Sequence, residues 1–353
     1  MKALRLLDWK SDPVLVEVAE PVAGPGQVLI RVGAAGACHS DVHLMRDFEP
    51  GQLPWNPPFT LGHENAGWVH SLGAGASGFD IGQPVAVYGP WGCGRCERCL
   101  IGSENYCENP EGRTVPHLGG GLGVDGGMAQ FMLVPSPRHL VALPEGLSPL
   151  DAAPLTDAGL TSYHAVQRSR AKLVPGSFAV VIGVGGLGHL AVQILKATTA
   201  AVVIALDTRR DALDLAVTCG ADHAFLSNDD ATEAVRHTTR GRGADVVLDF
   251  VGANATMALG ARVTRSMGDL TVVGIGGGSL AYSPLGVAPE VSIQHPYWGS
   301  RPELVAVLDL ASRGLVRAEY TMFSLDEALR AYASVEAGTV FGRAVIRPDL
   351  TSR

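Results

Sequence analysis

The sequence has no block of basic residues and no long apolar run. Among its 353 residues, Asp and Glu outnumber Lys and Arg by 35 to 27, which gives a formal net charge of −8. Proteins that bind the nucleic-acid backbone need clustered Lys and Arg, so we expect no nucleic-acid partner. No stretch is long and apolar enough to cross a bilayer, and residues 1–13 lack the features of a signal peptide. We therefore expect no membrane partner and a cytoplasmic location.

Charged residues and cysteines are also scarce. With 18% charged and 46% hydrophobic residues, the chain can bury substantial cores and is not disordered. The 44 glycines fall in clusters rather than in a period, and no repeat of solenoid or propeller length occurs, which excludes fibrous and repeat architectures. Six cysteines do not make a disulfide scaffold in a chain this long, so clustered ones are expected to bind metal. The length suggests two domains.

The hydrophobic pattern changes near residue 150. Before it, short β-branched segments alternate with Gly and Pro breaks, which predicts a β barrel or sandwich. After it, near-continuous apolar runs, first at 178–182 and 201–207, alternate with helical stretches such as 209–219 and 254–265. This alternation predicts a parallel sheet covered on both faces. A last strand within "GRAVIRP", residues 342–348, could rejoin the first domain, so the second domain is predicted to be an insertion.

A glycine-rich turn follows the predicted strand 178–182 and opens a helix. Its sequence "GVGGLG" fits the dinucleotide-binding pattern G-x-G-x-x-G. In that pattern Gly183 permits a tight turn, Gly185 lets the backbone approach a pyrophosphate, and Gly188 allows close packing of helix on strand. The helix N-terminus would present free N–H groups to the phosphates. The predicted cofactor-binding loop therefore comprises Gly183, Gly185, Gly186, Leu187 and Gly188.

An acidic residue stands where the dinucleotide pattern expects one. Asp207 follows Gly188 by 19 residues, at the end of the next predicted strand. Its carboxylate would bond the ribose hydroxyls of NAD and repel a 2′-phosphate. Arg209 and Arg210 come just after it and could tolerate that phosphate, so NAD is preferred over NADP but not exclusively.

Four of the six cysteines lie in one short segment with the spacing C-x₂-C-x₂-C-x₇-C: Cys93, Cys96, Cys99 and Cys107. Four thiolates this close predict a closed tetrahedral zinc site, which is structural because it has no open position. Ferredoxin-type iron–sulfur segments share the x₂ spacing but continue with x₃ and a proline, whereas here the gap is seven and Glu108 follows. Cys219, alone in a helical stretch, is expected to be a small buried apolar residue.

A second group of residues could form an open metal site. Cys38 and His63, with a carboxylate, would make three zinc ligands and leave a fourth position for water or substrate. Taken singly, Cys38 and His63 also fit a protein core. Asp157, in "LTDAGLTSYH", is equally explained as a helix N-cap, because Asp accepts bonds from the free N–H groups of a first turn.

Over essentially its full length the chain resembles the zinc-dependent alcohol dehydrogenases of the medium-chain superfamily. The motifs "GACHSDVH", "TLGHENAG", the four-cysteine segment, "DAGLTSYHA", "GVGGLG", Asp207 and "GRAV" come in the family's order. The resemblance implies a mainly β, GroES-like catalytic domain over residues 1–157 and 295–353, with a structural zinc lobe at about 91–108. It also implies a Rossmann domain over 158–294, a doubly wound parallel α/β sheet inserted into the first.

The resemblance also implies two zinc ions per chain, one structural and one catalytic. Cys38 and His63 match the first two catalytic ligands, and Asp157 occupies the place of the third, a cysteine in many relatives. A carboxylate is an ordinary zinc ligand, harder than thiolate. Glu64 resembles the family's acid that can approach the ion during ligand exchange.

Further roles carry over by the same resemblance. Ser40 would bond the alcohol oxygen, and His43 would end a proton relay that passes through the cofactor ribose. Cofactor contacts are implied for His39, Thr161 and Arg343. Candidates for the substrate pocket are Trp55, Leu122 and Trp298, whose aromatic members suit a hydrophobic substrate.

The implied reaction is reversible hydride transfer between NAD(H) and an alcohol or its ketone or aldehyde. Residues 296–299, "PYWG", are similar to bacterial members that act on secondary alcohols, which favours hydrophobic secondary alcohols. The alternatives are a polyol or primary-alcohol/aldehyde dehydrogenase of the same superfamily and, from a different class, a nucleotide-binding protein without catalysis. The expected partners are the small alcohol or carbonyl substrate and further copies of the chain, in a homo-dimer or homo-tetramer.

Overall fold

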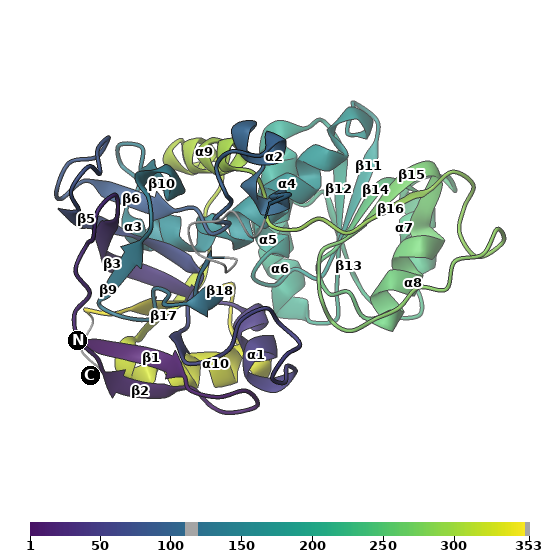
Figure 1. Cartoon of the computed structure of the whole chain (residues 1–353). Helices are drawn as coiled ribbons and strands as arrows, with labels where there is room; N and C mark the ends of the chain where they lie inside the picture. The colour runs from purple at the N-terminus through teal and green to yellow at the C-terminus, as the bar shows by residue number, and fades with distance from the viewer. Residues whose placement is uncertain (110–118, 350–353) are drawn as a thin grey trace. The chain divides into compact units, whose positions relative to one another are not determined.

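The computed structural model describes residues 1–109 and 119–349, which form two compact units (Figure 1). The first unit comprises Met1–Ala158, Ser300–Ser312 and Ala318–Arg353, and the second comprises Gly159–Gly299 and Arg313–Arg317. The chain thus leaves the first unit and returns to it. Within the described residues, no helix has the length and apolar character needed to cross a membrane.

The first unit is built on a seven-stranded sheet centred on β3 (Val28–Ala37). Its strand order is β10-β6-β5-β3-β18-β17, and β9 also pairs with β3. The C-terminal half of β3 pairs antiparallel with the start of β5 (Glu64–Leu72) on one side and with β18 (Arg343–Arg347) on the other. The remaining strands of this sheet are β6 (Pro84–Val87), β9 (Phe131–Val134), β10 (Leu140–Ala142) and β17 (Tyr320–Ser324).

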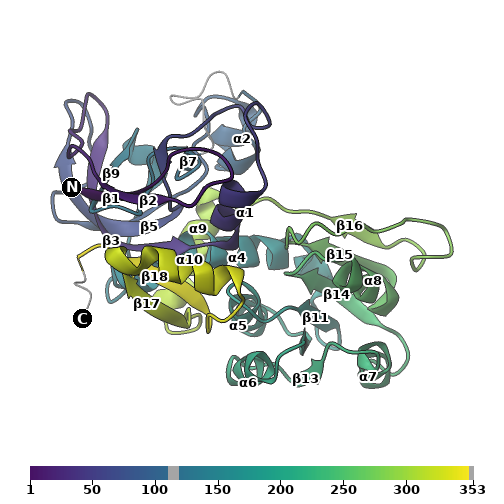
Figure 2. The same cartoon turned by 90° about the horizontal axis from the view of Figure 1, so that it is seen from below.

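Smaller elements complete this unit. A three-stranded sheet contains β1 (Lys2–Leu6), β2 (Val14–Glu17) and β4 (Phe59–Thr60), and a two-stranded one contains β7 (Gly119–Gly120) and β8 (Gly123–Val124). The helices are α1 (His39–Arg46), α2 (Glu97–Leu100), α3 (Pro149–Ala152), α9 (Arg301–Ser312) and α10 (Ala328–Glu336). Helix α10 contacts α1, and Figure 2 draws the two side by side although they lie at opposite ends of the chain.

The second unit is a six-stranded parallel sheet in the order β13-β12-β11-β14-β15-β16. The strands are β11 (Phe178–Ile182), β12 (Val202–Asp207), β13 (His223–Leu226), β14 (Ala244–Asp249), β15 (Thr264–Val272) and β16 (Ser292–Gln294). The helices are α4 (Ala158–Arg168), α5 (Gly188–Thr198), α6 (Arg210–Thr218), α7 (Ala231–Thr238) and α8 (Asn254–Val263). Numbered along the chain, this strand order is 3-2-1-4-5-6, the Rossmann order.

The architecture confirms the predicted fold class, a Rossmann-like parallel sheet inserted into a mainly β domain. The core of the parallel sheet consists of apolar side chains such as Val180, Ile204, Leu206 and Val247, all fully buried. The sequence pattern did not predict β13 or α7. Strand β13 lacks a clear apolar pattern because it is an edge strand whose residues are at most partly buried. The expectation of a buried Cys219 was wrong: it is the C-cap of α6 and is half-buried, since that helix ends near the surface.

Candidate metal centres and cofactor loop

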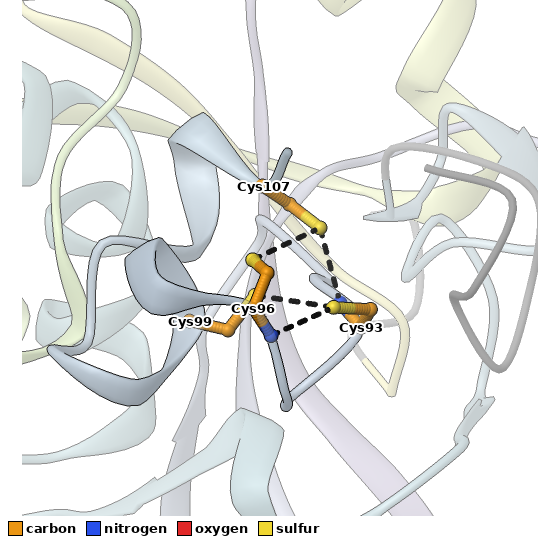
Figure 3. A group of neighbouring side chains, drawn as sticks. All are labelled: Cys93, Cys96, Cys99 and Cys107. Carbon is orange, nitrogen blue, oxygen red and sulfur yellow. Dashed lines mark hydrogen bonds between the residues drawn. The ribbon is translucent and has the colours of Figure 1, made fainter. Parts of the chain in front are cut away.

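The four clustered cysteines meet at one point in the first unit (Figure 3). Their sulfur atoms all lie within 4.8 Å of one another, with 3.9 Å between the Sγ atoms of Cys93 and Cys99 and 4.0 Å between those of Cys96 and Cys107. A tetrahedral zinc with bonds of about 2.3 Å separates its sulfur ligands by about 3.8 Å. The arrangement therefore fits a closed Cys₄ zinc site.

The electrostatics of this cluster also favour a cation. Backbone N–H groups, that of Cys99 first, lower the pKa of Cys96 to about 6, so this sulfur is a thiolate near neutral pH. Burial, together with the neighbouring thiols, raises the pKa of Cys99 to about 12. Four thiolates cannot stay charged this close together unless a positive ion binds them.

A partly buried ion pair joins the cysteine lobe to the rest of the unit. The Glu104 carboxylate accepts a bond from the Gly92 N–H at 3.0 Å and pairs with Arg138 at 2.5 Å. Arg138 also donates to the Gly92 carbonyl at 3.3 Å. His139, which is 1% exposed, lies with its Nδ1 atom 3.6 Å from the same carboxylate. These contacts fix the backbone just before Cys93.

A second group of ligand atoms lies elsewhere in the first unit and comes from Cys38, His63, Glu64 and Asp157. Their ligand atoms are all within 4.8 Å of one another. The Oδ2 atom of Asp157 is 3.8 Å from Cys38 Sγ and 3.5 Å from His63 Nε2. Around a tetrahedral zinc these separations would be about 3.6 and 3.4 Å. Three of the side chains therefore fit one ion and leave a fourth position open.

The local fold explains how residues far apart in sequence meet. Cys38 is the N-cap of α1 at the end of β3, His63 directly precedes β5, and Asp157 directly precedes Ala158, the first residue of α4. The position that suggested a helix cap is thus also next to two candidate ligands. A carboxylate has two oxygens, so the two roles do not exclude each other.

The hydroxyl of Ser40 lies beside these ligands. Its Oγ atom is 3.0 Å from Cys38 Sγ and 3.3 Å from His63 Nε2. The first turn of α1 carries both Cys38, as the N-cap, and Ser40, which explains their closeness. The structure thus brings the predicted proton-accepting hydroxyl to the metal-ligand group.

One residue of this site was missed by the sequence analysis. Asp41, fully buried, accepts bonds from His63 Nδ1 at 3.0 Å and from the Cys38 N–H at 3.1 Å. The phenol of Tyr332 donates a third bond to Asp41 at 2.9 Å. A carboxylate bonded to one ring nitrogen keeps the other free for a metal, so Asp41 orients His63 as a ligand. The only sequence signal was an acid three residues after an N-cap.

Glu64 forms a buried ion pair with Arg343. Gly36 makes room for it on β3, because a Cβ atom there would lie 1.9 Å from Glu64 Oε2. That oxygen has no hydrogen-bond partner among the described residues. Burial raises the pKa of Glu64 well above its usual value, although Arg343 opposes the shift. The contact of Arg343 with cofactor phosphates stays a prediction.

The charges around the candidate ligands form one coupled set. Burial raises the pKa of Cys38, but Arg343 and then His63 outweigh it, so the pKa of the thiol lies below its usual value. Burial lowers the pKa of His63, but Asp41 first, and Asp157 and Cys38 after it, raise it well above its usual value. Negative groups on several sides of the imidazole create a field that favours a cation at their centre.

His43 and His39 lie on α1. His43 Nδ1 bonds the carboxylate of the exposed Asp47, one turn further along the helix. The two imidazole rings meet edge to face with their centroids 5.1 Å apart. Burial, and then the charge of His43, lower the pKa of His39. The structure thus joins His43 to an exposed acid and to His39, and the roles of both histidines stay predictions.

The predicted cofactor loop lies in the second unit, between β11 and α5. Gly183 has a φ of +84°, which favours glycine, and a Cβ on Gly188 would lie 1.9 Å from the Gly183 carbonyl oxygen. A Cβ on Gly185 would meet nothing within 4 Å, so the backbone there faces open space. Leu187 is the N-cap of α5, where no side chain caps the helix N–H groups. This geometry suits a bound pyrophosphate.

The acid expected beside this loop is in place. Asp207 ends β12 and is 9% exposed. Its Oδ2 accepts a bond from the Val184 N–H at 2.7 Å, and its Oδ1 accepts one from the Arg209 N–H at 2.9 Å. The carboxylate is thus fixed at the glycine turn and retains lone pairs for ribose hydroxyls. Thr161 lies in the same unit, on α4, and is buried.

The predicted pocket residues are all buried. Trp55 packs against Trp9 and Phe59 in the first unit, with centroid distances of 5.7 and 5.4 Å. Leu122 is in the first unit and Trp298 is in the second. In the first unit, a cavity of about 420 Å³ is lined by other described residues, among them Trp91. The substrate pocket therefore stays a prediction.

Comparisons with known proteins show the family of the chain. Residues 24–145 match the alcohol dehydrogenase GroES-like domain family, and residues 186–313 match the zinc-binding dehydrogenase family. An NAD-dependent alcohol dehydrogenase of Sulfurisphaera tokodaii is 37% identical over 99% of this chain and 100% of its own.

Two solved structures are similar over nearly the whole chain. The alcohol dehydrogenase of Aeropyrum pernix is 38% identical, with a TM-score of 0.90 and coverage of 99% of this chain and 100% of its own. The acetophenone reductase of Geotrichum candidum, solved in complex with NAD, is 30% identical, with a TM-score of 0.85 and coverage of 99% and 98%.

Proposed function

Since the chain belongs to the zinc-dependent medium-chain alcohol dehydrogenase family, we propose that it oxidises hydrophobic secondary alcohols at a zinc held by Cys38, His63 and Asp157. The chain is an NAD-dependent alcohol dehydrogenase that acts on CH–OH groups. The observation that carries the site assignment is the meeting of three ligand atoms beside the Ser40 hydroxyl. Two zinc ions per chain follow, the second at the four cysteines.

The roles proposed for the side chains follow from their positions. A zinc ion held by the three ligands would lower the pKa of a neighbouring alcohol oxygen, and the nicotinamide would accept the hydride. Ser40 would accept the alcohol proton, and its hydroxyl, 3.3 Å from His63 Nε2, supports this role. His43, bonded to the exposed Asp47, would exchange that proton with solvent. Glu64 would act near the ion through the buried oxygen that bonds none of the other described residues.

We propose a separate role for each of two domains. Residues 1–157 and 295–353 would form the catalytic domain, and residues 158–294 would hold the dinucleotide. NAD is preferred because Asp207 is fixed at the glycine turn, where its charge would repel a 2′-phosphate. Contacts to the cofactor are also proposed for Thr161, His39 and Arg343. The enzyme is further proposed to be a homo-dimer or homo-tetramer, which sedimentation would test.

The substrate class rests on the similar acetophenone reductase and on the aromatic residues Trp55 and Trp298. The experiment is a panel of primary, secondary and polyol substrates, each measured with NAD and with NADP. We expect the highest kcat/KM for a hydrophobic secondary alcohol with NAD. A preference for polyols or primary alcohols would reject the substrate class and leave the dehydrogenase assignment intact.

A further inference from the structure

The Asp41 carboxylate connects two of the ligands of the candidate catalytic site. It is 0% exposed and bonds both the imidazole of His63 and the backbone N–H of Cys38, the two ligands nearest to it in sequence. Its orientation therefore sets the positions of two candidate ligands at once. A buried carboxylate holds one orientation only when its lone pairs are bonded.

The third bond to this carboxylate comes from the other end of the chain. Tyr332 on α10 is 4% exposed, and its hydroxyl lies 2.9 Å from Asp41 Oδ2. A phenol next to a carboxylate donates its proton. Burial, with the charge of Asp41 added to it, raises the pKa of Tyr332 well above its usual value, so the hydroxyl keeps its proton.

The surrounding contacts make this bond part of a rigid support. Helix α10 packs on α1, the helix that carries Asp41 (Figures 1 and 2). At the surface of the same contact, Arg46 on α1 pairs with Glu336 on α10 at 3.3 Å. An exposed pair of this kind contributes little energy, whereas the buried Tyr332–Asp41 bond is a specific link between the two helices.

We propose that Tyr332 is a positioning residue of the catalytic zinc site, which acts through Asp41 on His63 and Cys38 and so rests on the function proposed above. Its hydroxyl holds Asp41 Oδ2, which leaves Oδ1 facing His63 Nδ1. The imidazole then keeps its Nε2 atom directed at Asp157 Oδ2 and the Ser40 hydroxyl. Without the hydroxyl, the carboxylate can turn, and the ligands lose their preset geometry.

The test is a zinc titration of the full chain at chelator-buffered free zinc, with bound zinc per chain measured by mass spectrometry. Groups that bond a metal-bound imidazole typically contribute 10- to 100-fold to metal affinity. Because Tyr332 acts one bond further away, we expect Tyr332→Phe to weaken the catalytic zinc by about 10-fold. The structural zinc should be unaffected, since its four cysteines lie apart from this group.

Tyr320 provides a matched control in the same part of the chain. Its hydroxyl also donates to an aspartate, Asp151, at 3.1 Å, and Asp151 bonds Ser148 rather than a candidate ligand. Tyr320→Phe therefore removes the same kind of bond and should leave both zinc affinities unchanged. Phe keeps the ring volume in both variants, so the packing of the core is preserved.

A double-mutant cycle with Asp41→Asn tests the route of the effect. If Tyr332 acts through Asp41, adding Tyr332→Phe to Asp41→Asn should change zinc affinity by less than about 2-fold. The proposal is overturned if Tyr332→Phe alone binds zinc like the wild type, if its effect persists in Asp41→Asn, or if it loses the structural zinc or the folded state. A wild-type chain that binds only one zinc would instead reject the proposed catalytic site.

Discussion

Replacing Asp157 separates its two candidate roles, because Ser is as good a helix N-cap as Asp but a poor zinc ligand. If Asp157 is the third ligand, both Asp157→Ala and Asp157→Ser lose the catalytic zinc. If it is only a cap, Asp157→Ala loses about 1 kcal/mol of stability and Asp157→Ser loses almost none. Asp157→Cys supplies the residue found at this place in many relatives and should retain the ion.

The size of the zinc effect follows from the number of ligands. Four-ligand structural sites bind zinc with about 10–16 kcal/mol, or about 3 kcal/mol for each ligand. Loss of one ligand from a three-ligand site therefore weakens binding by about two orders of magnitude. The distances of 3.5 and 3.8 Å from Asp157 Oδ2 to the other two ligand atoms leave room for one shared ion.

The assay combines zinc analysis after dialysis, kcat/KM for an alcohol, and NAD affinity by fluorescence titration. Wild type and Asp157→Cys should retain two zincs per chain, whereas Asp157→Ala and Asp157→Ser should retain one and lose activity. NAD affinity should not change, because the glycine loop lies in the other unit. Two tightly bound zincs and full activity in Asp157→Ser would refute the ligand assignment.

Three further predictions concern stability and cofactor choice. Burial, reinforced by two neighbouring arginines, lowers the pKa of His139 to about 3 in the folded protein. In the unfolded chain the pKa of the imidazole returns to about 6.5, so between about pH 6.5 and 3 only the unfolded chain binds this proton. Stability should therefore fall as pH drops from about 6.5 toward 3, by up to about 1.4 kcal/mol per unit, and urea unfolding of His139→Gln should show a slope smaller by one proton. Gly188→Ala would bring a Cβ to within 1.9 Å of the Gly183 carbonyl, so NAD binding, measured calorimetrically, should weaken by at least 10-fold; unchanged binding would contradict the packing described. Asp207→Ser should raise kcat/KM with NADP relative to NAD by at least 10-fold, and an unchanged ratio in paired assays would show that Asp207 does not select the cofactor.

The parts of the fold that the sequence predicted are those set by local pattern. The glycine turn, the apolar strands on either side of it and the four-cysteine spacing each lie within a short segment, so spacing alone constrains them. The edge strand β13 escaped prediction because its residues are partly exposed and so lack a continuous apolar run. Cys219 was misjudged because periodicity does not show where a helix end meets solvent.

The parts of the site that escaped prediction depend on contacts between distant residues. Arg343 reaches Glu64 because β18 pairs with β3 next to β5, and no local pattern encodes that register. Tyr332 reaches Asp41 across 291 positions of sequence. The proposed catalytic ligands, Cys38, His63 and Asp157, have no diagnostic spacing, so their assignment as one set came from the resemblance.

The charge of the site gives an argument for a metal that is independent of resemblance. Cys38, Asp41 and Glu64 are buried, and the side chain of Asp157 is 14% exposed, so four acidic groups lie in one small region. Arg343 is the permanent cation paired with them. Burying uncompensated charge is costly, and each unpaired ion costs several kcal/mol. A divalent cation at the meeting point of the ligand atoms would compensate part of this negative charge. It would also hold Cys38 as thiolate and His63 as neutral imidazole, the forms that bind zinc. The charge of this group therefore favours a bound cation. If Asp157 is a ligand, its carboxylate, in place of a thiolate, would leave that ion with more of its positive charge to act on an alcohol.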